Sequence, residues 1–189
     1  MRALLLVSCL CAVAHADARL DAHLGGGLEG GTITRKPRPD AVAEVGLAGE
    51  WILPGRRVGV GAALETIARP GHDLAQYEEG KLDMMLRVRG DHDSHFGIGA
   101  GLRTLTPEPV DGQAQPSMWG VDFIHLDASL PLARRGHMGV AAYFAWTMGC
   151  YLGRGEQMTE RPQMLREVTC GDTMTTTYVV GAQLLFVDR

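Results

Sequence analysis

One segment of the chain carries the residue types of a hydrolytic triad. His125, Asp127 and Ser129 occupy alternate positions and would fall on one face of a strand. A nucleophilic serine needs a histidine base within hydrogen-bond reach, and that base needs an acidic partner. Alternate residues of a strand lie about 6.6 Å apart, so His125 and Ser129 would be out of each other's reach. We expect these residues to be interior polar packing, and we predict that the protein is not an enzyme.

The densest group of potential metal ligands is Asp91, His92, Asp93 and His95. A tight turn here would bring two or three of them together, but no fixed zinc spacing is matched and turns are commonly polar. The glycines alternate within strand-like segments, and none forms a phosphate-binding loop that opens a helix. The sequence therefore predicts neither a metal nor a cofactor.

Alternation with a period of two dominates the chain and predicts the elements that must position these groups. In residues 81–90 the odd positions are mostly charged and the even positions are mostly apolar. On a helix these residues would mix around the cylinder, so a strand with two different faces is indicated. A phase change after Phe123 predicts a β-bulge. The eight predicted strands are 19–29, 43–53, 58–69, 81–90, 95–106, 118–133, 138–148 and 173–187.

The connections between these strands alternate in length. Residues 54–57, 90–94 and 134–136 are short turns, whereas 34–40, 70–80, 107–117 and 153–172 are long. A membrane barrel with short turns on one side and long loops on the other has this pattern. The predicted fold class is therefore all-β, a closed antiparallel up-and-down transmembrane β-barrel of about eight strands. In the longest loop we expect a short helix around 163–168, or a binding surface.

The less apolar face of the strands combines small residues with charges. Gly or Ala occupies every second position on this face in 59–63 and 97–101, whereas a solvent face would hold Lys, Glu, Thr or Ser. The interior of an eight-stranded barrel is just wide enough for side chains, so small residues must accompany long ones. Buried charges must pair, so we expect a salt-bridged lumen. The predicted lumenal charges are Glu44, Glu50, Glu65, Lys81, Asp83, Arg87, Arg89, Arg103, Asp122 and Asp127, together with Arg57.

The first residues predict export. Met1 and Arg2 precede an apolar stretch that ends in Ala14-His15-Ala16, a signal-peptidase pattern, so we expect 1–16 to be a cleaved signal and 17–189 to be the barrel domain. A lipobox ending at Cys9 is the alternative. Two cysteines, Cys150 and Cys170, remain in the exported part, and we predict that they form a disulfide worth about 3 kcal/mol. The slightly acidic net charge of −4 gives no indication of nucleic-acid binding.

This pattern resembles the small eight-stranded outer-membrane barrels of the OmpA and OmpX type, and we expect no peptidoglycan-binding domain. Gly181, Leu184 and Phe186 resemble the terminal signal that the outer-membrane assembly machinery recognises. Two departures are that residues 187–189 follow the aromatic residue and that Val179 stands where a polar residue is usual. The resemblance implies an outer-membrane location, with membrane lipid and the assembly machinery as partners. The candidates for aromatic girdles are Trp51, Trp119, Trp146, Tyr143, Tyr151 and Tyr178.

The sequence favours a monomeric, non-enzymatic barrel. Its expected role is in envelope structure or in surface interaction through the outer loops, with a surface ligand on 153–172. Three alternatives stay open: a small outer-membrane channel, a soluble periplasmic ligand-binding barrel with its faces reversed, and a lipid-modifying outer-membrane enzyme.

Overall fold

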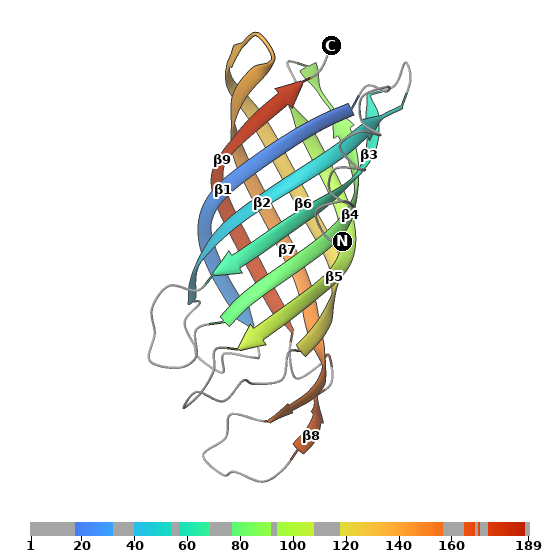
Figure 1. Cartoon of the computed structure of the whole chain (residues 1–189), viewed down its shortest axis with the longest axis vertical. Coiled ribbons are helices and arrows are strands. Elements are labelled where there is room, and N and C mark those ends of the chain that lie inside the picture. Colours follow the sequence, from blue (N-terminus) through green and yellow to red (C-terminus); the bar gives the residue numbers. More distant parts are fainter. Residues whose placement is uncertain are drawn as a thin grey trace, which may run out of the picture.

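The computed structural model is a closed barrel of eight long strands (Figure 1). It describes residues 18–31, 40–53, 57–68, 77–91, 94–107, 118–156, 165–168, 170 and 174–187. No helix among these residues is long and apolar enough to cross a membrane. The barrel strands are β1 (Ala18–Gly31), β2 (Asp40–Ile52), β3 (Val58–Ala68), β4 (Tyr77–Arg89), β5 (His95–Pro107), β6 (Met118–Arg135), β7 (Met138–Glu156) and β9 (Thr175–Val187).

The eight barrel strands pair in the order in which they occur along the chain. From β1 to β7 the neighbours follow chain order, and β9 closes the barrel by pairing with both β7 and β1. All pairings are antiparallel, which is the up-and-down arrangement that short hairpins allow. The predicted fold class, a closed antiparallel up-and-down barrel, is confirmed.

The additional strand β8 (Leu165–Val168) lies outside the barrel wall. It pairs with Gly153–Glu156, where β7 extends past the predicted strand end at residue 148. The expected helix around 163–168 is therefore wrong for the residues of β8. The extended part of β7 would otherwise leave a row of unpaired backbone groups, which β8 satisfies. A disulfide joins Cys150 of β7 to Cys170, just after β8, and confirms the predicted bond.

The predicted β-bulge is present in β6. The register of β6 against β7 shifts between Asp122 and Ile124, and its register against β5 shifts at the same level. Phe123 and Ile124 consequently both lie on the outer side, while Asp122 and His125 are both buried inside. The bulge therefore keeps two interior side chains in place despite their odd spacing.

The two ends of the barrel differ. One end, here called the turn end, holds the β2–β3, β4–β5 and β6–β7 connections, the start of β1 and the last residues of β9 (top of Figure 1). The β6–β7 turn contains Gly136 at φ 60°, a conformation that suits glycine. The other end, called the loop end, holds β8 and the strand ends that the longer connections join. The short and long connections therefore segregate as the sequence predicts.

Candidate functional site

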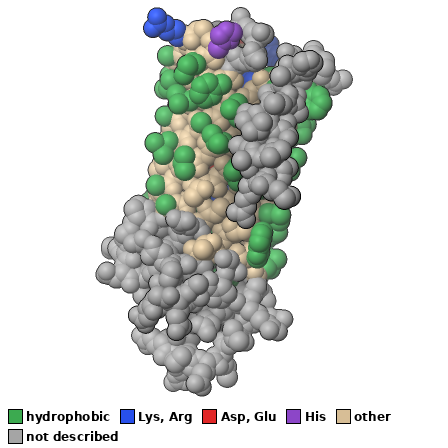
Figure 2. Space-filling model, in the orientation of Figure 1, with side chains coloured by type: hydrophobic (Ala, Val, Ile, Leu, Met, Phe, Trp, Pro, Cys, Tyr) green, Lys and Arg blue, Asp and Glu red, His purple; other side chains and the backbone are tan. Residues whose placement is uncertain are grey.

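The outer surface of the barrel wall is apolar. Leu64 and Trp119 are 54% and 63% exposed, and Figure 2 shows hydrophobic side chains spread along the wall with Arg/Lys and His at its upper rim. We call these outward apolar residues the outer belt. Its members include Leu24, Leu47, Trp51, Leu64, Leu82, Met84, Phe96, Leu102, Trp119, Phe144, Tyr178, Val180 and Leu184.

The interior of the barrel is charged. Each of the ten lumenal charges predicted from the sequence is at most 7% exposed. Asp21, His23, Glu29, Glu79, His95 and His125 are buried with them. Arg57 is the exception: its side chain is 71% exposed in the β2–β3 turn, where it pairs with Asp91 at 3.0 Å. The expectation that Arg57 lies in the lumen is wrong, because the residue precedes β3 and belongs to the turn rather than to an inward-facing strand position.

Glycines on neighbouring strands make room for these large side chains. A Cβ on Gly97 would overlap the carboxylate of Asp127, and one on Gly59 would overlap that of Glu50. A Cβ on Gly149 would lie 2.6 Å from both Arg103 and Asp122. The alternation of small and long residues that the sequence showed is therefore a packing requirement of the narrow interior.

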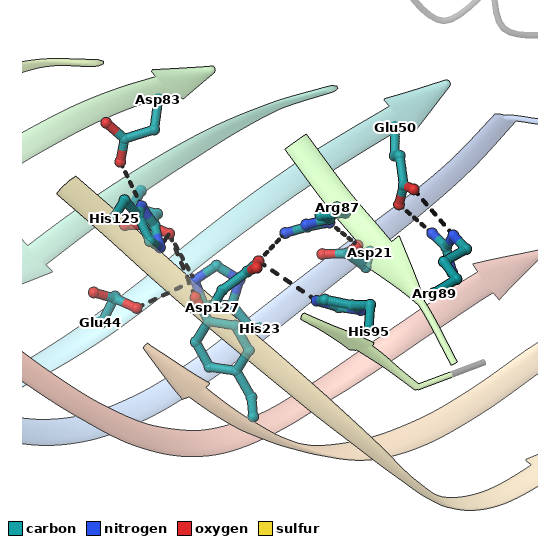
Figure 3. Close-up of polar contacts among 12 residues, drawn as sticks. Asp21, His23, Glu44, Glu50, Asp83, Arg87, Arg89, His95, His125 and Asp127 are labelled. Carbon is teal, nitrogen blue, oxygen red and sulfur yellow. Dashed lines mark hydrogen bonds and ion pairs between the residues drawn. The ribbon is translucent and has the colours of Figure 1, made fainter. Parts of the chain in front are cut away.

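The turn-end cluster lies nearest the short turns. Arg87 donates to Asp21 at 2.9 Å and to Asp127. Arg89 donates twice to Glu50, with Nε 3.0 Å from Oε1, in the bidentate arrangement that planar guanidinium groups favour. Figure 3 shows Arg87 beside Asp21 and Asp127, and Arg89 beside Glu50. The cluster comprises Asp21, Glu50, Arg87, Arg89, His95 and Asp127.

The middle cluster comprises His23, Glu44, Glu65, Asp83 and His125, from β1, β2, β3, β4 and β6 (Figure 3). His23 Nε2 lies 3.3 Å from Glu44 and 3.7 Å from Glu65 Oε1. His125 Nε2 lies 3.7 Å from the same Glu65 oxygen, and its Nδ1 lies 2.6 Å from Asp83. Glu65 therefore stands between two imidazole rings.

Two further residues fix the position of His23. The ring of Tyr143 stacks on it at a centroid distance of 4.2 Å, and the Tyr143 hydroxyl lies 3.5 Å from Glu65. Gly46 lies opposite both His23 and Glu65 in the strand register, where a Cβ would overlap the imidazole. The His23 ring is thus held between the Tyr143 ring and the backbone at Gly46.

The loop-end cluster comprises Glu79, Arg103 and Asp122. Arg103 pairs with Asp122, lies 3.4 Å from Glu79 and donates to Thr175. Its guanidinium carbon lies 5.3 Å from the ring centroid of Tyr151, within the range of a cation–π contact. One arginine therefore ties β4, β5, β6 and β9 together near the loops.

The structure separates the members of the triad candidate. His125 bonds to Asp83, and Asp127 bonds to Arg87 and lies 3.4 Å from His95. Ser129 Oγ has no hydrogen-bond partner in the described part of the chain. Ser129 lies opposite His95 in the β5–β6 register, but no hydrogen bond joins them, so these residues pack the interior instead.

The structure also separates two of the potential metal ligands in the turn, Asp91 and His95. Asp91 is exposed and pairs with Arg57, whereas His95 points into the barrel toward Asp127. His92 and Asp93 lie outside the described residues. The structure instead brings potential metal ligands together in the middle cluster, from five strands. The alternation marked the polar face that holds them, but only the strand register shows that they meet.

Two of the aromatic girdle candidates lie inside the barrel. Tyr143 and Tyr151 are buried, so their assignment to girdles is wrong, because both occupy inward positions of β7. Trp51, Trp119 and Tyr178 are exposed on the outer belt, and Trp146 stacks against Tyr178 at 6.4 Å.

The three residues of the predicted assembly signal lie on β9. Gly181 faces inward, where a Cβ would overlap the backbone of Leu24. Leu184 and Phe186 lie on the outer belt. The described part of the longest loop is limited to 153–156, 165–168 and 170, so its predicted ligand surface lies largely outside the described residues.

Comparison with known proteins gives the fold. No protein-family model and no curated protein matches the sequence. Among solved structures, Neisserial surface protein A (NspA) aligns with a TM-score of 0.62 at 7% identity, over 92% of this chain and 98% of that chain. Ail, the attachment invasion locus protein of Yersinia pestis, solved with the heparin analogue sucrose octasulfate, gives 0.51 at 12% identity, over 89% and 97%. The chain therefore has the fold of the small eight-stranded barrels that the sequence resembles.

Proposed function

We propose that this protein is a non-enzymatic outer-membrane β-barrel that supports envelope structure or presents its outer loops to surface partners. One observation carries the proposal: the polarity of the barrel is reversed relative to a water-soluble protein. Large apolar side chains of the outer belt face outward, while Asp83, Arg103 and Glu65 are buried inside.

The reversed polarity fits a bilayer. A strand protein can cross hydrocarbon only as a closed barrel, because every backbone group must then be satisfied between strands. The barrel strands are 11 to 19 residues long, and a tilted membrane strand needs about 9–11. In water, an apolar belt around the whole wall would be far larger than the patches that monomeric proteins usually expose. A soluble periplasmic barrel is therefore not favoured.

The interior argues against the channel and enzyme alternatives. Three ionic clusters follow one another along the lumen, and the arginines of the turn-end and loop-end clusters bond to residues of non-adjacent strands. Such cross-links fill the narrow space of an eight-stranded barrel rather than leaving a wet path. Ser129, the serine of the triad candidate, also makes no hydrogen bond to a histidine in the described part of the chain. A closed, cross-linked barrel serves as a rigid anchor for its loops.

The orientation and partners follow from the two ends. In outer-membrane barrels the short turns face the periplasm and the long loops face outward. We expect membrane lipid to contact the outer belt, and the assembly machinery to recognise Gly181, Leu184 and Phe186. A monomer suffices for all of this, and a surface ligand would bind residues of 153–172. Because Ail was solved with a heparin analogue, immobilised heparin is a suitable first probe for such a ligand.

Electrophoretic mobility with and without boiling tests the proposal. The protein is extracted with detergent from separated inner and outer membranes, with the soluble fraction as control. We expect a heat-dependent shift in the outer-membrane fraction only. Recovery as an unshifted soluble protein would overturn the proposal, and steady conductance steps in planar bilayers would replace it with a channel.

A further inference from the structure

The middle cluster contains no arginine, whereas each of the other two clusters does. Glu50, Asp127 and Asp122 each bond to an arginine. Three carboxylates of the middle cluster, Glu44, Glu65 and Asp83, have no arginine among their described ion pairs. Lys81 lies opposite Glu65 in the strand register and supplies one positive charge. Two further positive charges are needed, since unbalanced buried charge is costly.

Several buried ligand atoms of the cluster make no hydrogen bond within the described structure. They are Nε2 of His23, Nε2 of His125, both carboxylate oxygens of Glu44 and Oε2 of Glu65. His23 and Glu44 are at most 2% exposed. A buried polar atom without a hydrogen bond costs about 1–3 kcal/mol, so a bound group that uses these lone pairs would stabilise the cluster.

The distances suit ligands that share one ion. Ligand atoms at about 2.0–2.2 Å from a tetrahedral zinc ion are roughly 3.3 Å apart. The separations here are 3.3 Å between His23 and Glu44, and 3.7 Å from each of the two histidine Nε2 atoms to Glu65 Oε1. Two three-residue sets, each with its ligand atoms within 4.8 Å of one another, meet at Glu65.

His125 and Asp83 lie on the other side of Glu65. The Asp83 carboxylate is 2.6 Å from Nδ1 of His125, and Nε2 of His125 is 3.7 Å from Glu65 Oε1. Residues that hold a ligating carboxylate from behind are usual in metal sites.

We propose that the middle cluster binds one divalent transition-metal cation inside the barrel. The ligands are Nε2 of His23 and the carboxylates of Glu44 and Glu65, with His125 as the positioning residue of Glu65. Imidazole together with carboxylate suits Zn²⁺ and its neighbours better than Mg²⁺ or Ca²⁺, which prefer oxygen alone. The ion supplies the two missing charges while both imidazoles stay neutral.

The ion has to enter before the barrel closes. The turn-end cluster lies on one side of the site, and on another side a buried apolar group is packed around Tyr143. That group comprises Val42, Ile67, Tyr143, Ala145 and Val179. The ion therefore ties β1, β2 and β3 together and stabilises the folded barrel without any role in catalysis.

The test refolds the untagged chain from urea into detergent with equimolar Zn²⁺, removes free ion by gel filtration and measures bound metal by mass spectrometry. Glu44→Gln and His23→Asn remove ligands. Glu50→Gln is the matched control, a buried lumenal carboxylate of the turn-end cluster that bonds to Arg89. Heat-dependent mobility checks that each variant has folded, and Co²⁺ provides an absorption spectrum of the coordination geometry.

We expect about one Zn²⁺ per folded wild-type chain. The ligand variants should retain no more than about one tenth of the Zn²⁺ that wild type retains, and Glu50→Gln should retain as much as wild type. Zn²⁺ should also raise the urea midpoint of wild type but not that of Glu44→Gln. Two results overturn the proposal: folded wild type that retains no ion, so that the imidazoles carry the balancing charge as cations, or equal retention by Glu44→Gln and Glu50→Gln, which would indicate adventitious binding elsewhere.

Discussion

Gly46 and His23 are partners across the β1–β2 pair, and a Cβ on Gly46 would overlap the imidazole ring. Glu65, the partner of Gly46 on β3, is also close, with its Cγ 2.9 Å from that Cβ position. The missing side chain therefore creates the space in which a histidine and a glutamate from the two neighbouring strands meet.

The substitution Gly46→Ala should destabilise the barrel. The added methyl group must displace the His23 ring, which Tyr143 holds from its other face, and overpacking of this kind costs about 1–3 kcal/mol. Urea unfolding in detergent, followed by tryptophan fluorescence, measures the loss. Gly49→Ala is the control, because a Cβ there meets nothing within 4 Å and should change stability by less than about 0.5 kcal/mol. Equal effects of the two substitutions would argue against the described packing.

The substitution Arg87→Met should be among the most damaging in the lumen. It leaves Asp21 and Asp127 buried without their shared cation, and breaking such a network typically costs about 3–5 kcal/mol. Adding Asp127→Asn should restore part of the loss, because one of the unpaired charges is then removed. The same unfolding assay applies. Arg57→Met, which removes an exposed pair with Asp91, should cost less than about 1 kcal/mol. If Arg87→Met also lowered the free energy of unfolding by less than about 1 kcal/mol, the interior would have to be hydrated.

The strands and their faces could be predicted because alternation is a local property of the sequence. The bulge in β6 was visible for the same reason, as a phase change after Phe123. The lumenal position of Glu44 and Arg103 likewise follows from which face is small and charged. What alternation leaves undetermined is the register between strands, because a pair of strands can slide by two residues without exchanging faces.

The partners inside the lumen depend on that register. Glu65 meets His23 only because Gly46 lies between them, and it meets His125 across the barrel from β6. No spacing in the sequence encodes either contact. The sequence therefore does not predict the middle cluster, whereas the ligand types around Asp91 are adjacent in the sequence and easily recognised. The strand β8 was missed for a related reason: it pairs with an extension of β7 that its own four residues do not reveal.

Loss of the disulfide should loosen the loop end more than the barrel wall. Cys150 and Cys170 enclose a loop with a sequence separation of 20 residues, for which the chain-entropy model gives about 3 kcal/mol. The double substitution Cys150→Ala and Cys170→Ala should lower the urea midpoint, and a reducing agent should do the same to wild type. The reducing agent should leave the double variant unchanged. Alkylation of both thiols in folded, unreduced wild type would contradict the bond.

A charge placed on the outer belt should be costly at mid-height and tolerated at the rim. Leu64 lies in the middle of β3, between Leu47 and Leu82 on the neighbouring strands, and Arg at the bilayer midplane costs about 2–4 kcal/mol. Leu132 lies near the turn end, close to Arg134, where the cost falls to about 0–1 kcal/mol. Leu64→Arg should therefore refold poorly into lipid vesicles, as judged by heat-dependent mobility, while Leu132→Arg should resemble wild type. Because a water-facing wall would accept arginine equally well at both positions, equal refolding of the two variants would remove the main support for a membrane location.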